Sequence, residues 1–148
     1  MRIECAGVAD TMAVGRRLAS LLRPGDVVLL AGRLGAGKTV FVSGMAEGLG
    51  IDDRITSPSF VLVRSYEGFL GLTHADAYRL GSSGELEDLG LEETVGEGVL
   101  VIEWGNVLDS TFGEDALVVS IEVGPDDART ITLEARGSWR ARALEELA

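Results

Sequence analysis

The sequence is short of the residues that several classes of protein require. Cys5 is the only cysteine, so the chain can form neither an internal disulfide nor a cluster of thiolate metal ligands. No apolar run approaches the ~20 residues that cross a membrane, and the start, MRIECAGVAD, lacks the apolar stretch of a secretory leader. We therefore expect a soluble, cytoplasmic protein with no membrane contact.

Basic residues are also scarce. The chain has 13 Lys and Arg against 24 Asp and Glu, a formal net charge of −11. Binding to a nucleic-acid backbone needs clustered Lys and Arg, so unaided binding to nucleic acid is not expected, although a partner protein can supply a basic surface. The 148 residues are enough for one core, and we expect residues 1–148 to form a single domain.

What the sequence does contain is a glycine-rich loop between a strand-like and a helix-like segment. AGRLGAGKTV, residues 31–40, satisfies the pattern G-x-x-x-x-G-K-[ST], called a P-loop. Its glycines let backbone N–H groups turn toward phosphates, its lysine reaches the β- and γ-phosphates, and its threonine hydroxyl ligates Mg²⁺. The residues predicted to bind a nucleotide here are Gly35, Ala36, Gly37, Lys38, Thr39 and Val40.

The segments around the loop predict a three-layer α/β/α P-loop NTPase fold with a mixed sheet. VVLLA, before the loop, is typical of a strand buried on both faces, and TVFVSGMAEGLG, after it, has helical spacing. Ile3 and Cys5 indicate an opening strand, followed by a helix that we expect Asp10 or Thr11 to cap. FVLVRSY and FLGLTH predict a β-hairpin after the P-loop helix.

The second half of the chain supplies further strands and helices. GVLVIEW predicts another buried strand, and ALVVSIEV and RTITLEA predict two more, joined by the turn GPDDA. An acidic helix is expected to begin near Ser83. Trp139, Ala143 and Leu147 are spaced to line a closing helix. Doubly wound sheets bind ligands at the carboxyl ends of their strands, where the P-loop would lie.

Hydrolysis of a bound nucleotide needs a second acid at the end of a buried strand, which holds the magnesium shell or orients water. Glu103 closes GVLVIE, and Asp76 in THADAYRL follows the hairpin, so both can approach the ion. We assign Lys38, Asp76 and Glu103 to the catalytic set. Thr39, Asp76 and Glu103 are the candidate metal ligands. His74, the only histidine, is by itself more often a structural hydrogen-bonding residue than a catalyst.

The segment TSPSF lies just past the P-loop helix, where nucleotide switches carry a hydroxyl toward the γ-phosphate and metal. Pro58 would stiffen it. The same residues are also typical of a simple helix-to-strand turn, and chemistry alone does not choose between the two. The candidate switch residues are Ser57, Pro58, Ser59 and Phe60.

Five strings resemble the TsaE (YjeE) family in order and spacing: GDVVLLAGRLGAGKTVF, TSPSFVLVRSY, HADAYRL, ELEDLGLEE and VIEWG. The resemblance runs from DTMAVGRRLASLL to ARTITLEA. It implies a Mg²⁺-dependent P-loop ATPase, weak alone and stimulated by partners, that is required for threonylcarbamoyladenosine modification of tRNA next to the anticodon. ATP and Mg²⁺ are the implied ligands. TsaD and TsaB are the implied partners, with tRNA reached only through their complex and ATP hydrolysis supporting multiple turnovers.

The resemblance also implies individual roles. Thr11, in the opening T-x-x-x-G, and Arg129 would contact the nucleotide. Ser59 stands where the family usually has Thr and keeps the hydroxyl of the switch. Arg33 replaces an acid of the usual loop, and it either adds positive charge beside the phosphates or points to solvent. Val40 replaces a common second Thr, a loss that leaves the metal unaffected if Thr39 is its ligand.

The main alternative is a small-molecule or nucleotide kinase, which also needs a P-loop. Kinases devote a lid with several Arg residues to the acceptor, but the longest candidate lid here, residues 81–98, is acidic. A GTPase is disfavoured because no N-K-x-D string occurs. A module that binds a nucleotide only for shape would not need both Asp76 and Glu103. The acidic stretch from 81 to 103 is either an exposed face or a docking surface for basic partners.

Overall fold

The computed structural model describes residues 1–33, 35–56, 63–76, 98–104 and 114–148. Its strands are β1 (Arg2–Cys5), β2 (Val27–Ala31), β3 (Val63–Tyr66), β4 (Gly71–Asp76), β5 (Gly98–Trp104), β6 (Leu117–Val123) and β7 (Arg129–Ala135). Its helices are α1 (Val8–Ala19) and α2 (Lys38–Gly48), with short 3₁₀ helices η3 (Gly137–Ala141) and η4 (Leu144–Leu147).

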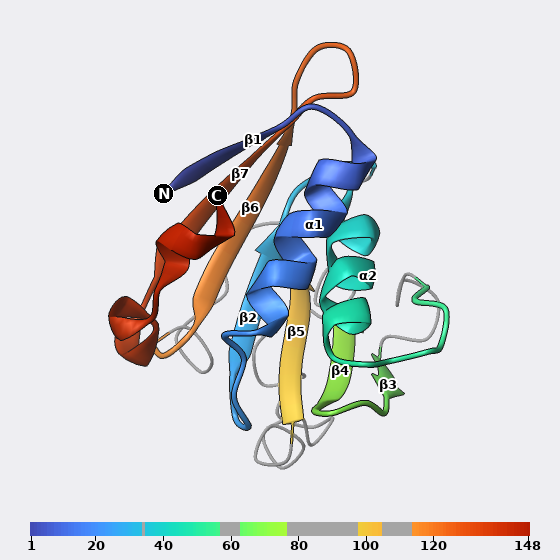
Figure 1. Ribbon diagram of the computed structural model, residues 1–148, viewed down its shortest axis with the longest axis vertical. Helices are drawn as coiled ribbons and strands as arrows, with labels where there is room; N and C mark the ends of the chain where they lie inside the picture. The colour runs from blue at the N-terminus through green and yellow to red at the C-terminus, as the bar shows by residue number, and fades with distance from the viewer. Residues whose placement is uncertain (34, 57–62, 77–97, 105–113) are drawn as a thin grey trace.

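The strands form one seven-stranded sheet in the order β1-β7-β6-β2-β5-β4-β3 (Figure 1). β2 runs parallel to both β5 and β6, and β4 runs parallel to β5. β3, β7 and β1 join as antiparallel strands. The predicted mixed α/β sheet is therefore confirmed, as is the hairpin after the P-loop helix, formed by β3 and β4. The carboxyl ends of β2, β4, β5 and β6 meet at one edge, and that edge carries the P-loop.

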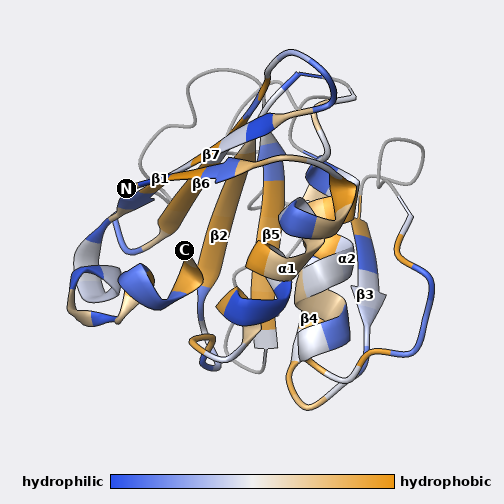
Figure 2. Cartoon of the chain, turned by 45° about the horizontal axis from the view of Figure 1, so that its top comes forward, coloured by the Kyte–Doolittle hydropathy of each residue, from blue (hydrophilic) through white to orange (hydrophobic). Residues whose placement is uncertain are grey.

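β2 is held by apolar contacts on both faces, as its continuous apolar sequence predicts. Val28 and Leu30 belong to a core cluster that also contains residues of α1 and α2, whereas Val27 and Leu29 belong to a second cluster on the opposite face. All four are at most 6% exposed. Figure 2 shows the central strands as the most hydrophobic part of the sheet. The P-loop therefore begins at the end of a strand that is held in place by packing on both faces.

α1 and α2 lie side by side on one face of the sheet (Figure 1), and glycines let them approach closely. A Cβ at Gly15 of α1 would overlap the carbonyl of Phe41, and a Cβ at Gly44 of α2 would overlap the carbonyl of Met12. This contact was not predicted from the sequence. It fixes the amino end of α2, where the P-loop ends, against α1.

The start of α1 differs from the predicted one. The helix begins at Val8, and its N-cap is Gly7, which makes no side-chain capping bond. Asp10 lies inside the first turn, and its Oδ2 accepts a 2.9 Å hydrogen bond from the backbone N–H of Ala6. The prediction that Asp10 or Thr11 caps the helix is therefore wrong. The carboxylate instead reaches back past the start of the helix, and its negative charge interacts favourably with the positive end of the helix dipole.

The closing helix is also interrupted. Trp139 and Leu147 are buried as predicted, each 1% exposed, but they lie on η3 and η4 rather than on one helix. The break is at Arg142, whose backbone is extended (φ −91°, ψ 151°). Its guanidinium makes hydrogen bonds of 2.5 and 2.7 Å to the carboxylate of Asp26 and one of 3.1 Å to the carbonyl of Leu21. These tertiary contacts outweigh helical propensity.

Candidate functional site

The P-loop connects the end of β2 to the start of α2 through backbone conformations that favour glycine. Gly35 and Gly37 have φ values of 82° and 106°, in the left-handed region that residues with a Cβ rarely adopt. Gly37 is the N-cap of α2, and the backbone N–H of Ala36 donates a 3.0 Å hydrogen bond to the carbonyl of Arg33. The loop thus ends at a helix N-terminus, where backbone N–H groups and the helix dipole favour an anion.

Lys38 is the first residue of α2 and folds back over the loop. Its side chain is largely buried, with the whole residue 8% exposed. The Nζ ammonium donates a 2.6 Å hydrogen bond to the carbonyl of Gly32, at the other end of the loop. The lysine therefore spans the mouth of the loop, which is where a phosphate-binding ammonium must lie. Thr39 follows in the first turn and is half-buried.

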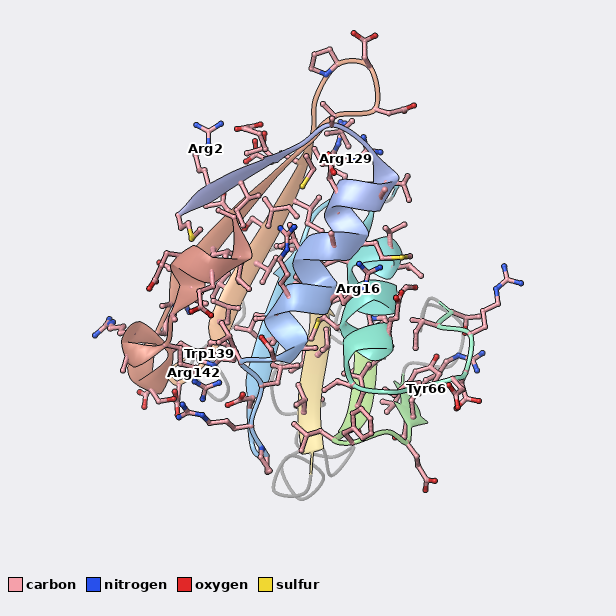
Figure 3. All side chains as sticks on the ribbon, in the orientation of Figure 1. Arg2, Arg16, Tyr66, Arg129, Trp139 and Arg142 are labelled. Carbon is pink, nitrogen blue, oxygen red and sulfur yellow. The ribbon has the colours of Figure 1, made fainter. Side chains whose placement is uncertain are left out.

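Thr11 and Arg129, which the family resemblance places at the nucleotide, both border the P-loop. A Cβ built at Gly37 would lie 3.9 Å from Arg129 Nε and 4.0 Å from Thr11 Cγ2. Arg129 Nε donates a 2.8 Å hydrogen bond to the carbonyl of Ala36, and one terminal nitrogen lies 3.5 Å from the carbonyl of Gly35. Figure 3 shows Arg129 beside the amino end of α1. This contact between the guanidinium and the loop carbonyls was not predictable from the sequence pattern, because the two segments are 93 residues apart.

Asp76 and Glu103 face each other at the carboxyl ends of neighbouring strands. They are direct register partners on β4 and β5, and Glu103 is also paired with Leu30 on β2. Register partners project from the same face, so both acids point to the face of Leu30, which carries α2. They are 3% and 4% exposed, respectively. The structure therefore brings both predicted acids beside the strand that leads into the P-loop.

His74 lies beneath these acids on the same face. It precedes Asp76 by two residues on β4 and is 0% exposed. Its Nε2 is 3.4 Å from Glu103 Oε1. Among the described residues, neither ring nitrogen of His74 nor Glu103 Oε1 has a hydrogen-bond partner.

The residues fit a magnesium ion bound together with phosphates. Within the described ranges, no group of three or more His, Cys, Asp or Glu side chains forms a metal centre. A magnesium ion in a P-loop protein does not need such a group, because phosphates and waters complete a coordination shell begun by a hydroxyl and one or two carboxylates. The buried, unpartnered Oε1 of Glu103 is an oxygen that a nearby cation would satisfy.

A cavity of about 490 Å³ adjoins the start of the P-loop. It lies where the ladder between β2 and β6 ends at Ser120, while β6 continues to Val123. Arg33 lines this cavity and is exposed to solvent. The residue therefore lies beside the loop and is also in contact with water. The lining residues are Ala31, Gly32, Arg33, Ser120, Ile121, Glu122 and Val123. The β6 residues were not predicted from the sequence, because their place beside the P-loop depends on the pairing of β6 with β2.

Two of the predicted features lie outside the described residues. These are the candidate switch, Ser57 to Phe60, and the acidic helix expected to begin near Ser83. In the described part of the chain, no helix is long and apolar enough to cross a membrane.

The sequence matches the family described as Threonylcarbamoyl adenosine biosynthesis protein TsaE over residues 5–131. The tRNA threonylcarbamoyladenosine biosynthesis protein TsaE of Treponema pallidum (strain Nichols) is 46% identical over 134 residues, covering 90% of this chain and 99% of that protein. Its namesake from Bacillus subtilis (strain 168) is 41% identical over 140 residues, covering 93% and 87%. The crystal structure of Bacillus subtilis YdiB matches with a TM-score of 0.78 and 35% identity, over 99% of this chain and 93% of that chain.

Proposed function

The chain belongs to the TsaE family and acts in the biosynthesis of tRNA threonylcarbamoyladenosine, and from that premise we propose that its part there is Mg²⁺-dependent ATP hydrolysis. One observation carries the proposal. Asp76 and Glu103 are register partners on the face of the sheet that bears α2, beside the strand that leads into a complete P-loop. A loop that merely held a nucleotide for shape would not need two buried acids there.

The P-loop residues would hold the phosphates of ATP. The loop glycines turn backbone N–H groups inward, and the amino end of α2 adds its dipole. The Lys38 ammonium already spans the loop through its hydrogen bond to the Gly32 carbonyl. When ATP binds, the ammonium would contact the β- and γ-phosphates, in place of that carbonyl or together with it. Arg129 keeps the carbonyls of Gly35 and Ala36 turned outward, away from the anion.

Asp76 and Glu103 would help to bind the metal ion and to orient the attacking water. Thr39 through its hydroxyl, and Glu103 and Asp76 through their carboxylates, would hold Mg²⁺ or its water shell. When bound, Mg²⁺ neutralises charge that develops on the phosphates during hydrolysis. Glu103 Oε1 is buried and without a hydrogen-bond partner among the described residues, so it can accept a hydrogen bond from a water and orient it.

The acidic charge supports a protein partner as the route to tRNA. With a net charge of −11, the chain is not suited to hold a nucleic-acid backbone by itself. In the proposed arrangement TsaD and TsaB contact the tRNA, and this chain binds them through complementary charge. Its hydrolysis is weak alone and stimulated in their complex, where it supports repeated turnovers.

The test is reconstitution of tRNA modification with TsaD and TsaB, with and without this chain and with and without Mg²⁺. We expect multiple turnovers only when the chain, ATP and Mg²⁺ are all present. Lys38→Ala should lose nucleotide binding, whereas Glu103→Gln should keep the nucleotide and lose turnover. Modification that proceeds equally well without the chain would refute the proposal. Transfer of phosphate to a small acceptor would instead identify a kinase.

A further inference from the structure

His74 is a buried polar side chain at the site that has no part in the hydrolysis as described above. It is 0% exposed and is the register partner of Val101 on β5. Glu103 follows Val101 by two residues, so the side chains of His74 and Glu103 project from the same face. The two residues are therefore neighbours across the β4–β5 ladder, one pleat apart.

The polar atoms of these two side chains are close but not hydrogen-bonded. His74 Nε2 lies 3.4 Å from Glu103 Oε1. In the described part of the chain, neither of these atoms nor His74 Nδ1 has a hydrogen-bond partner. A buried polar atom left unsatisfied costs about 1–3 kcal/mol. A small rotation of either side chain would bring an N–H on Nε2 into hydrogen-bond range of Oε1.

We propose that His74 positions Glu103 by donating a hydrogen bond from Nε2 to Oε1, which sets the plane of the carboxylate. The inference rests on the Mg²⁺-dependent hydrolysis proposed above, and His74 acts in it only through Glu103. Carboxylates that bind a metal are usually hydrogen-bonded by neighbouring groups, and loss of such a neighbour costs about 10–100-fold in metal affinity or activity. The hydrogen on Nε2 is present both in one neutral tautomer and in the imidazolium.

A positioning role and a packing role make different demands on residue 74. Packing depends on the volume of the side chain, whereas positioning depends on where the N–H donor lies. Glutamine places its amide nitrogen near the position of Nε2, and asparagine places its amide nitrogen near that of Nδ1. His74→Gln and His74→Asn are therefore matched variants with the same donor chemistry and different reach.

The experiment compares these variants with the wild-type chain by calorimetric titration of ATP, once with Mg²⁺ and once with EDTA. In EDTA, both variants should bind ATP as the wild type does, because the P-loop is unchanged. With Mg²⁺, His74→Gln should retain the metal-dependent gain in ATP affinity, whereas His74→Asn should lose most of that gain, because mispositioned carboxylates weaken metal binding about 10–100-fold. Thermal denaturation checks that each variant is folded. His74→Leu, which has no donor, replaces His74→Asn if that variant does not fold.

Equal losses in the two amide variants would overturn the inference in favour of packing, and no loss in either would overturn it outright. A second test uses Glu103→Ala as the background. There His74→Asn should cause no further loss, because the carboxylate to be positioned is gone, and a full additional loss would contradict the inference. Failure of the proposed function is a different result, since the wild-type chain would then support no ATP hydrolysis with TsaD and TsaB, whichever residue stands at position 74.

Discussion

Arg129 Nε donates a 2.8 Å hydrogen bond to the backbone carbonyl of Ala36, a residue 93 positions earlier in the chain. The donor stands at the start of β7, and the acceptor lies inside the P-loop. Two carbonyls of the loop are thereby bonded to a guanidinium, at the point where the loop enters α2. The conformation of the loop thus depends on a strand that is remote in sequence.

Arg129→Lys should therefore weaken nucleotide binding almost as much as Arg129→Ala. Lysine keeps the charge, but its donors share one nitrogen and lack the planar fork with which the guanidinium reaches both carbonyls. Because hydrogen bonds to charged groups contribute about 1.5–3 kcal/mol, we expect a loss of about 10-fold or more in ATP affinity, measured by calorimetry. Arg2→Lys is the control, since Arg2 is exposed and pairs with Glu4. Wild-type affinity in Arg129→Lys would show that the charge alone matters.

Gly44→Ala should destabilise the protein strongly. A Cβ at this position would overlap the backbone carbonyl of Met12, which cannot move without displacing α1. Overpacking of this kind costs about 1–3 kcal/mol, visible as a lower urea midpoint at unchanged slope. The matched control is Gly71→Ala, whose Cβ would meet, among the described residues, only the Tyr66 carbonyl at an ordinary 3.7 Å. Equal stability of the two variants would mean that α1 and α2 separate easily.

Arg142→Ala should unfold the protein at markedly lower urea concentration than the wild type. Arg142 and Asp26 form a buried ion pair, with side chains 5% and 7% exposed, and the guanidinium stacks 3.9 Å from the ring centroid of Trp139 (Figure 3). Removing one partner of a buried pair costs about 3–5 kcal/mol, because the other charge is left buried. Arg140→Ala, an exposed neighbour, should change stability by less than about 0.5 kcal/mol. A similar effect of both substitutions would refute a special role for the pair.

Asp115 should contribute stability at neutral pH that disappears on acidification. Its Oδ1 accepts hydrogen bonds of 2.7 Å from the Ser138 hydroxyl and 2.9 Å from the Ser138 N–H, and these lower the pKa of Asp115 below its ordinary 3.8. A lowered pKa stabilises the folded state above the ordinary value, and the gain is lost as pH falls through the folded pKa. Ser138→Ala should raise the pKa of Asp115 in a carboxyl NMR titration. An unchanged pKa would contradict the assigned cause.

The elements that the sequence predicted best are those whose form depends on local pattern. VVLLA and GVLVIEW were identified as buried strands because parallel strands covered on both faces are continuously apolar. The P-loop was found because its glycines are required by the backbone of the loop itself. The interruption at Arg142 was not predictable, because Asp26 is 116 residues away in sequence. The placement of His74 against Glu103 likewise follows only from the register of β4 with β5.

The pairing of β1 with β7 limits how early in translation the chain can complete its fold. Ile3 emerges early but must wait for its register partner Ile131. α1, β2 and α2 are synthesised before β7, yet the P-loop lacks Arg129 until the start of β7 has emerged. A bound nucleotide stabilises only the states that bind it. ATP therefore cannot assist the folding of the nascent chain through the complete loop until synthesis reaches its last strand.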